Sequence, residues 1–107
     1  MSDSVTKGSG NVFEDLGFAR ASEEQTKARL VRELRAIIEG RKLTQTAAGA
    51  VIGLAQPDLS QLLRGRTRGY TVDRLLRFLM AFGRDIEIHI TKRPKSRRQS
   101  RMAVTAG

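Results

Sequence analysis

Polar side chains able to recognise nucleic-acid bases gather on one short stretch of the chain. Gln56 is followed by Ser60, Gln61 and Arg64, a spacing that puts all four on one side of an α-helix. A glutamine amide can pair with the edge of adenine, and an arginine fork can pair with guanine. We therefore predict that these four residues contact bases in double-stranded DNA. The competing interpretation is the solvated polar face of an ordinary helix.

A second set of side chains suits the sugar–phosphate backbone. Gln45 precedes this helix, and Arg66 and Arg68 follow it closely. Donors at these places would hold the backbone on either side and fix position without reading sequence. Arg74 and Arg77 lie one helical turn apart farther along, and ordinary solvation explains them more simply.

The distribution of charge favours a polyanionic partner. The chain of 107 residues has a formal net charge of +9. Residues 1–40 carry six Lys or Arg and seven Asp or Glu, whereas the rest of the chain carries fourteen and four. The basic part contains all the candidate DNA contacts, so its positive field suits DNA better than a merely soluble surface requires.

An enzyme is the competing functional class. A ribonuclease could use His89 and Tyr70, but the pattern puts one on a strand and the other in a turn, with no reason to converge. The chain has no cysteine, no glycine-rich phosphate loop and no metal-ligand spacing. We expect a protein that is not an enzyme and needs no cofactor or metal.

The length predicts one domain, and the hydropathy pattern indicates the compartment. No apolar run approaches the ~20 residues that a membrane-spanning helix needs. The first residues also lack the apolar core of a signal peptide. We expect a cytoplasmic protein without a membrane partner.

Two short helices joined by a tight turn must position the polar residues. The run QTAAGAVIGLAQPDLSQL begins at Gln45, with Thr44 capping a first helix over 45–52 and a second helix over 56–63. Gly53 allows the backbone to turn left-handed between them, and Gly49 lets the helices touch. The residues expected to face inward are Ala48, Ile52, Leu54, Leu59 and Leu62. This is the pattern of a helix-turn-helix.

Two further helices complete a mainly α fold. Ser22 and Gln25 form a capping box that opens a helix ending near Glu39. Thr71 caps the last helix. Apolar residues recur at helical spacing in both, at Leu30, Val31, Leu34, Ile37 and Ile38 in the first and at Val72, Leu75, Leu76, Leu79 and Phe82 in the last. We predict a helical bundle around these two stripes.

One β-strand is predicted after the bundle, at residues 85–91. Ile86, Ile88 and Ile90 alternate with Glu87 and His89, which is the period of a strand. The isoleucines should cover the last helix. The chain offers this strand no partner, so we expect antiparallel pairing with the same strand of a second copy, making 86–90 the dimerisation site of a homodimer.

The two ends of the chain have little to bury. Residues 1–11 are predicted to be disordered, residues 12–92 to form the helix-turn-helix domain, and residues 93–107 to form a flexible basic tail. Nonspecific DNA affinity, insertion into a minor groove, RNA binding and simple solubility all remain open for the tail.

From Leu43 to Arg68 the chain resembles the helix-turn-helix of the Xre family, which includes the lambdoid phage repressors. The run TQ…G.AQ…L.QLL.G.T.R matches without a gap. The resemblance implies a lambda-repressor-like fold, with Gln56 and Gln61 at base-reading positions and Gln45, Arg64 and Arg66 at backbone-contacting positions. Pro57 departs from the phage pattern, which has a polar side chain there.

A longer resemblance, over residues 12–91, points to HigA-type antitoxins. The segments that carry it are VFEDLGF, LTQ, QPDLSQLLRGR and DIEIHI. It implies a dimer that represses its own operon and binds a small basic ribonuclease toxin of the RelE/HigB superfamily. The candidate toxin contacts are Val12, Phe13, Leu16 and Phe18, which alternatively complete the protein's own core. A stand-alone repressor without a toxin is the alternative function.

Overall fold

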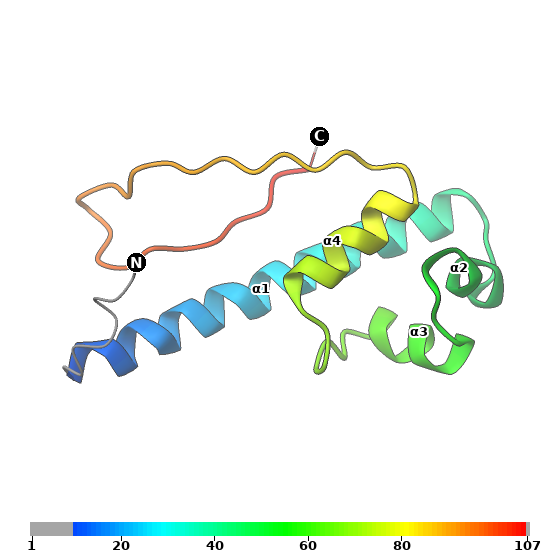
Figure 1. The fold of residues 1–107 in the computed structure, drawn as a ribbon, viewed down its shortest axis with the longest axis horizontal. Coiled ribbons are helices and arrows are strands. Elements are labelled where there is room, and N and C mark those ends of the chain that lie inside the picture. The colour runs from blue at the N-terminus through cyan, green and yellow to red at the C-terminus, as the bar shows by residue number, and fades with distance from the viewer. Residues whose placement is uncertain (1–9, 107) are drawn as a thin grey trace.

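Four helices make up the protein in the computed structural model, which describes residues 10–106 and the side chains from residue 21 onward. They are α1 (Gly10–Gly40), α2 (Gln45–Ile52), α3 (Gln56–Leu63) and α4 (Val72–Ala81). Figure 1 shows α1 as a long rod with α4 alongside its C-terminal half and α2 and α3 grouped at that end. The mainly helical architecture is therefore confirmed.

The core lies where α4, α2 and α3 meet the C-terminal half of α1. The predicted stripe of α1 is buried throughout, from Leu30 to Ile38. It meets the apolar face of α4, whose most buried members are Leu75, Phe78, Leu79 and Phe82. Leu59 and Leu62 of α3 and Ala48 of α2 have no exposed surface and complete the core. Helical periodicity identified these positions because each helix buries one face only.

Local side chains cap the helices where the sequence predicted them. The Thr44 hydroxyl accepts a hydrogen bond from the Ala47 amide at 3.0 Å, and the Thr71 hydroxyl accepts one from the Arg74 amide at 3.0 Å. Caps of this kind each contribute about 1 kcal/mol. The C-terminal ends of α1 and α4 are also joined to each other, because the Arg41 guanidinium donates to the Phe82 carbonyl at 2.6 Å.

The predicted start of the first long helix at Ser22 is wrong. The helix α1 runs without interruption from Gly10 through Ser22. The Ser22 hydroxyl bonds instead to the backbone of Met102, as donor to its carbonyl at 3.0 Å and acceptor from its amide at 2.6 Å. Serine is disfavoured in helix interiors because its hydroxyl competes for the hydrogen bonds of nearby backbone groups. Here the Met102 backbone is the partner of the hydroxyl instead, which removes this competition.

The segment after α4 is extended, but it forms no strand within residues 10–106. Ile86 is half-buried against the core, whereas residues Ile88 and Ile90 are 77% and 94% exposed. The expectation that all three isoleucines cover α4 is therefore wrong. The segment leaves the core after Ile86, and the described part of the chain holds no neighbouring strand to complete a hydrogen-bonded ladder.

The C-terminal residues fold back toward α1 instead of continuing outward. The Arg97 amide donates to the Pro94 carbonyl at 3.1 Å, and the Arg93 guanidinium donates to the Arg98 carbonyl at 2.7 Å. Beyond this turn the chain returns along α1, where Val104 packs against the core (Figure 1). The mobility of this segment in solution stays a prediction.

Candidate nucleic-acid interface

A tight turn brings α2 and α3 into close contact. The Leu54 amide donates to the Gly49 carbonyl at 2.9 Å, and Gly53 adopts φ = +77° at the end of α2. A Cβ atom on Gly49 would collide with the Leu54 carbonyl oxygen. Both glycines are therefore required by the backbone path, one for its left-handed conformation and one for the close approach. The predicted helix-turn-helix geometry is confirmed.

The helix α3 buries its leucines and presents a polar face. Leu59, Leu62 and Leu63 are buried. On the opposite side, Gln56, Gln61 and Arg64 are exposed, and Ser60 is half-buried. Pro57 lies in the first turn of α3, where its missing N–H leaves no helical bond unmade. The fold therefore leaves three candidate base contacts on α3 and the fourth, Arg64, at its C-cap, and all but Ser60 are exposed.

A hydrogen bond across the turn holds the first of these residues. The Gln56 Nε2 donates to the Gln45 Oε1 at 2.6 Å. The second N–H and the carbonyl oxygen of Gln56 are still available, and this pair is what the adenine edge requires. The sequence analysis assigned Gln56 to base contact and Gln45 to backbone contact but missed the hydrogen bond between them. The sequence does contain a signal for this bond, because each helix begins with a glutamine and the turn fixes how the beginnings of the two helices face each other.

Three arginines lie beyond the end of α3. Arg64, Arg66 and Arg68 are exposed, and none of them forms an ion pair with a carboxylate in the described part of the chain. The loop that carries them connects α3 to α4 and lies on the same side of the molecule as α3 (Figure 1). Unpaired guanidinium groups beside a polar helix face can form bidentate hydrogen bonds with phosphate oxygens.

Helix α1 is hydrogen-bonded to the loop that carries Arg64, Arg66 and Arg68, which we call the arginine loop. Thr67, between two of the arginines, is only 8% exposed, and its hydroxyl donates to the Glu24 carboxylate at 3.2 Å. The same carboxylate group pairs with Lys27 at 3.3 Å. The sequence offered no signal for this contact, because Glu24 and Thr67 are far apart along the chain. Its effect is to fix the loop relative to the long helix.

The arginines of α4 are engaged within the protein. Arg77 donates to Asp73 at 2.9 Å, and this carboxylate raises the pKa of the arginine. The Arg74 guanidinium stacks 4.8 Å from the centre of the Tyr70 ring, which makes an edge-on contact with Phe78. Tyr70 is half-buried and packs against the core. The arginines of α4 therefore differ from those of the arginine loop, which have no such internal contacts in the described part of the chain.

The remaining candidate residues fall outside this surface. His89 and Glu87 are exposed and face each other at 3.2 Å on the segment after α4. The side chains of Val12, Phe13, Leu16 and Phe18 lie outside the described part, although their backbone belongs to α1. In that part we find neither a cluster of metal-binding side chains nor a helix that is long and apolar enough to cross a membrane.

Comparisons with known proteins agree with this geometry. A family model described as a helix-turn-helix domain matches residues 12–91. A solved structure named as an XRE family transcriptional regulator is 42% identical to this chain, covers 82% of it and 99% of its own length, and superposes with a TM-score of 0.75. A search of curated proteins finds no match.

Proposed function

This chain belongs to the XRE family of helix-turn-helix DNA-binding proteins, and from that premise we propose that it is a sequence-specific transcriptional repressor. The observation that carries the proposal is the polar face of α3. Its exposed glutamines and arginine stand opposite a fully buried leucine face, so α3 can enter a major groove without exposing the core.

We assign base recognition to Gln56, Ser60, Gln61 and Arg64. The hydrogen bond that Gln56 donates to Gln45 restricts the rotamers of Gln56, so less conformational entropy is lost when Gln56 pairs with a base. Each good contact of this kind gives about 1–3 kcal/mol of discrimination against a wrong base. Ser60 is less exposed than the other three, which suits a secondary contact.

Gln45, Arg66 and Arg68 are assigned to the DNA backbone. The arginines are exposed and carry no internal partner among the described residues. The anchor from Glu24 to Thr67 supports this role, because it holds the loop in place before DNA arrives. Contacts of this kind supply affinity and register on the duplex, whereas the contacts from α3 supply specificity.

The repressor is proposed to act as a homodimer joined by residues 85–91. The support is an extended segment with two exposed isoleucines, Ile88 and Ile90, and no strand partner within the described chain. Pairing with a second copy would satisfy the backbone and cover these side chains. A two-fold dimer would also present two copies of α3 to two half-sites of an operator.

As a finer proposal, the protein is the antitoxin of a toxin–antitoxin pair. Its support is the HigA-like pattern over residues 12–91 and the near-neutral N-terminal third, where Glu14 and Asp15 adjoin four apolar residues. An acidic and apolar segment suits a small basic toxin of the RelE/HigB type. A stand-alone repressor of the same family fits the DNA-binding residues equally well.

Two experiments test these proposals. Footprinting on the DNA upstream of the protein's own gene should reveal a protected site with two-fold symmetry, and selection from random duplexes should return the same sequence. Failure to enrich any sequence would contradict the repressor. Purification of the tagged protein from its native cells, with identification of any small basic partner, separates the antitoxin from the stand-alone repressor.

A further inference from the structure

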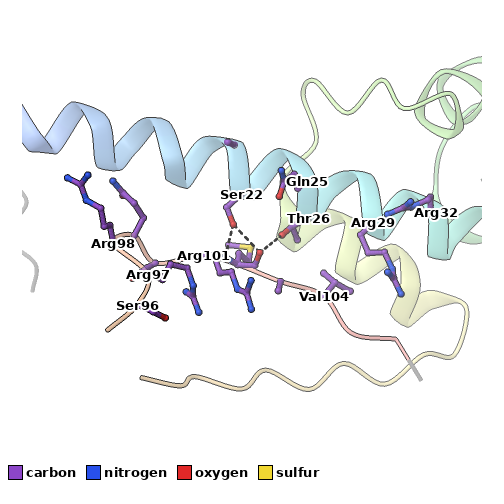
Figure 2. Close-up of a pocket in the computed structure, with 15 residues that line it drawn as sticks. Ser22, Gln25, Thr26, Arg29, Arg32, Ser96, Arg97, Arg98, Arg101 and Val104 are labelled. Carbon is purple, nitrogen blue, oxygen red and sulfur yellow. Dashed lines mark hydrogen bonds between the residues drawn. The ribbon is translucent and has the colours of Figure 1, made fainter. Parts of the chain in front are cut away.

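A cavity of about 1050 Å³ lies between α1 and the returning C-terminal segment. Figure 2 shows its two walls, one from residues 21–32 of α1 and the other from residues 96–104. Ser22 and Thr26 face this segment through their bonds to Met102, whereas Glu24 bonds to the arginine loop. Residues two apart on a helix point about 200° apart. The cavity is therefore on the opposite side of α1 from the arginine loop.

Five arginines line this cavity, and we call it the arginine cavity. They are Arg29 and Arg32 from α1 and Arg97, Arg98 and Arg101 from the C-terminal segment (Figure 2). No aspartate or glutamate is among the lining residues. Within the described chain, Arg29 alone of the five forms an ion pair, with Glu33 at 3.2 Å. Like charges that line one cavity repel one another, and a bound anion would relieve that repulsion.

The wall that carries three of the arginines is held in place. The Met102 backbone is bonded to Ser22 by both its amide and its carbonyl, and the Thr26 hydroxyl donates to the same carbonyl at 3.4 Å. Val104, two residues farther along the chain, packs against the core. These contacts anchor the segment on one side of the arginines, and the bond from Arg93 to Arg98 shapes the turn on the other.

We propose that the arginine cavity binds the phosphodiester backbone of a nucleic acid. All five of its cations are guanidinium groups, whose planar forks match two phosphate oxygens at once. The site is too large for a single phosphate, and both walls contribute charge, as a ligand with several phosphates requires. No aromatic side chain lines it, so it has no platform for stacking bases and binds without preference for sequence.

The test starts from a variant whose candidate operator surface is disabled by Arg64→Gln, Arg66→Gln and Arg68→Gln. Binding of labelled random-sequence duplexes and single strands is followed by fluorescence anisotropy over a range of salt concentrations. We expect binding to persist. The added changes Arg97→Gln, Arg98→Gln and Arg101→Gln should then make the negative slope of log Kobs against log salt shallower, reducing its magnitude by about 2.7 on duplexes or about 2 on single strands. The two probes show which nucleic acid is bound.

A matched control removes the same charge outside the cavity. Arg84→Gln, Lys92→Gln and Lys95→Gln lie on the same C-terminal part of the chain, and none of these residues lines the arginine cavity. This triple variant should keep most of the binding. An equal loss in the control would overturn the proposal, because net charge alone would then explain the affinity. Stronger competition by polyglutamate than by nucleic acid of equal charge would also overturn it, in favour of an acidic protein partner.

The proposal rests on the proposed function only in naming nucleic acid as the partner, and the two can fail separately. In the otherwise unchanged chain, the three substitutions in the cavity should leave operator affinity and the thermal transition unchanged. If the protein recognises no operator but the cavity variant still loses binding to random nucleic acid, the repressor is contradicted and the cavity stands. If operator binding is intact and the disabled variant binds no random nucleic acid, the cavity proposal is wrong.

Discussion

At the scale of single residues, the interface separates side chains that would read bases from side chains that would grip phosphate. Gln61 is exposed on α3 and carries no charge, whereas Arg66 is exposed in the loop and forms no ion pair in the described chain. These two residues can therefore be tested against each other, because a base contact and a phosphate contact respond differently to sequence and salt.

We expect Gln61→Ala to lower affinity for the operator by about 1–3 kcal/mol and to leave binding to random DNA nearly intact. Arg66→Ala should weaken binding to all sequences and reduce the salt slope by about 0.9, the contribution of one phosphate. Anisotropy titrations on operator and random duplexes measure both effects. An equal loss on the two duplexes for Gln61→Ala would remove this residue from the base-reading set.

The hydrogen bond between Gln45 and Gln56 predicts coupling between a backbone contact and a base contact. The bond is 2.6 Å long and joins two helices, so loss of either side chain releases the other. We expect Gln45→Ala and Gln56→Ala to be non-additive in operator affinity, with a coupling of about 0.5–3 kcal/mol. A double-mutant cycle measures it, and Gln45→Ala with Gln61→Ala serves as the control. Additivity in the first pair would mean that the bond does not act in the complex.

At the scale of elements, α1 serves two surfaces at once. Within little more than one turn, Glu24 holds the arginine loop while Ser22 and Thr26 hold the C-terminal segment. These contacts lie on opposite sides of the helix, and each binds α1 to a segment that is distant from it in the sequence. The long helix thus positions loops as well as supplying the central stripe of the core.

The anchor of the arginine loop is tested at Thr67. Replacement by valine keeps the shape of this buried side chain but removes its bond to Glu24. Net hydrogen bonds contribute about 1 kcal/mol, so we expect a loss of about fivefold in affinity on every DNA sequence. Glu24→Gln keeps an acceptor and should keep most of the affinity, whereas Glu24→Ala should behave like Thr67→Val. Full affinity in Thr67→Val would show that the loop needs no anchor.

The proposed dimer strand is tested with proline, which removes one backbone donor. In an extended strand the backbone groups of successive residues point to opposite edges, so Glu87→Pro and His89→Pro probe one edge and Ile88→Pro probes the other. Prolines on the paired edge should raise the dimer dissociation constant at least about fivefold, the equivalent of one lost hydrogen bond. Sedimentation velocity measures this, with Glu87→Ala and His89→Ala as controls. Unchanged dimers in all three proline variants would place the association surface elsewhere, with α1 as the next candidate.

At the scale of the whole molecule, the core lies at one end of α1. Every described α1 residue of the core cluster lies at or beyond Leu30, although the helix begins at Gly10. The basic C-terminal segment returns along the part of α1 that α2, α3 and α4 do not cover (Figure 1). The molecule therefore measures 48 Å along its longest axis but only 27 and 22 Å along the others.

Deletion of residues 1–21 separates the two roles considered for the N-terminal segment. If Val12, Phe13, Leu16 and Phe18 form a recognition arm, the shortened protein should lose the toxin and keep operator affinity. Its thermal transition should also be preserved, because the described core contacts begin beyond the deletion. Calorimetry and a toxin pull-down measure these outcomes. Loss of the cooperative transition would assign the four residues to the core and contradict the recognition arm.

Short-range rules were enough to predict much of this protein. The turn of the helix-turn-helix, the caps at Thr44 and Thr71 and the buried stripe from Leu30 to Ile38 follow from residues a few positions apart. Caps, left-handed glycines and helical periodicity depend on local backbone geometry, so they can be recognised in a sequence. The candidate DNA-contacting face of α3 was predicted for the same reason, because the burial of Leu59 and Leu62 determines which side of the helix remains exposed.

Only the tertiary structure decided the contacts that join distant parts of the chain. Ser22 has the pattern of a helix cap, yet it bonds to Met102, 80 residues away. The bonds from Gln56 to Gln45 and from Thr67 to Glu24 also depend on how elements pack. The strand pattern at 85–91 likewise has no partner strand among residues 10–106, since alternation describes the faces of a strand but cannot supply its neighbour. Periodicity identifies which face of an element is apolar, whereas packing decides what that face and its polar neighbours meet.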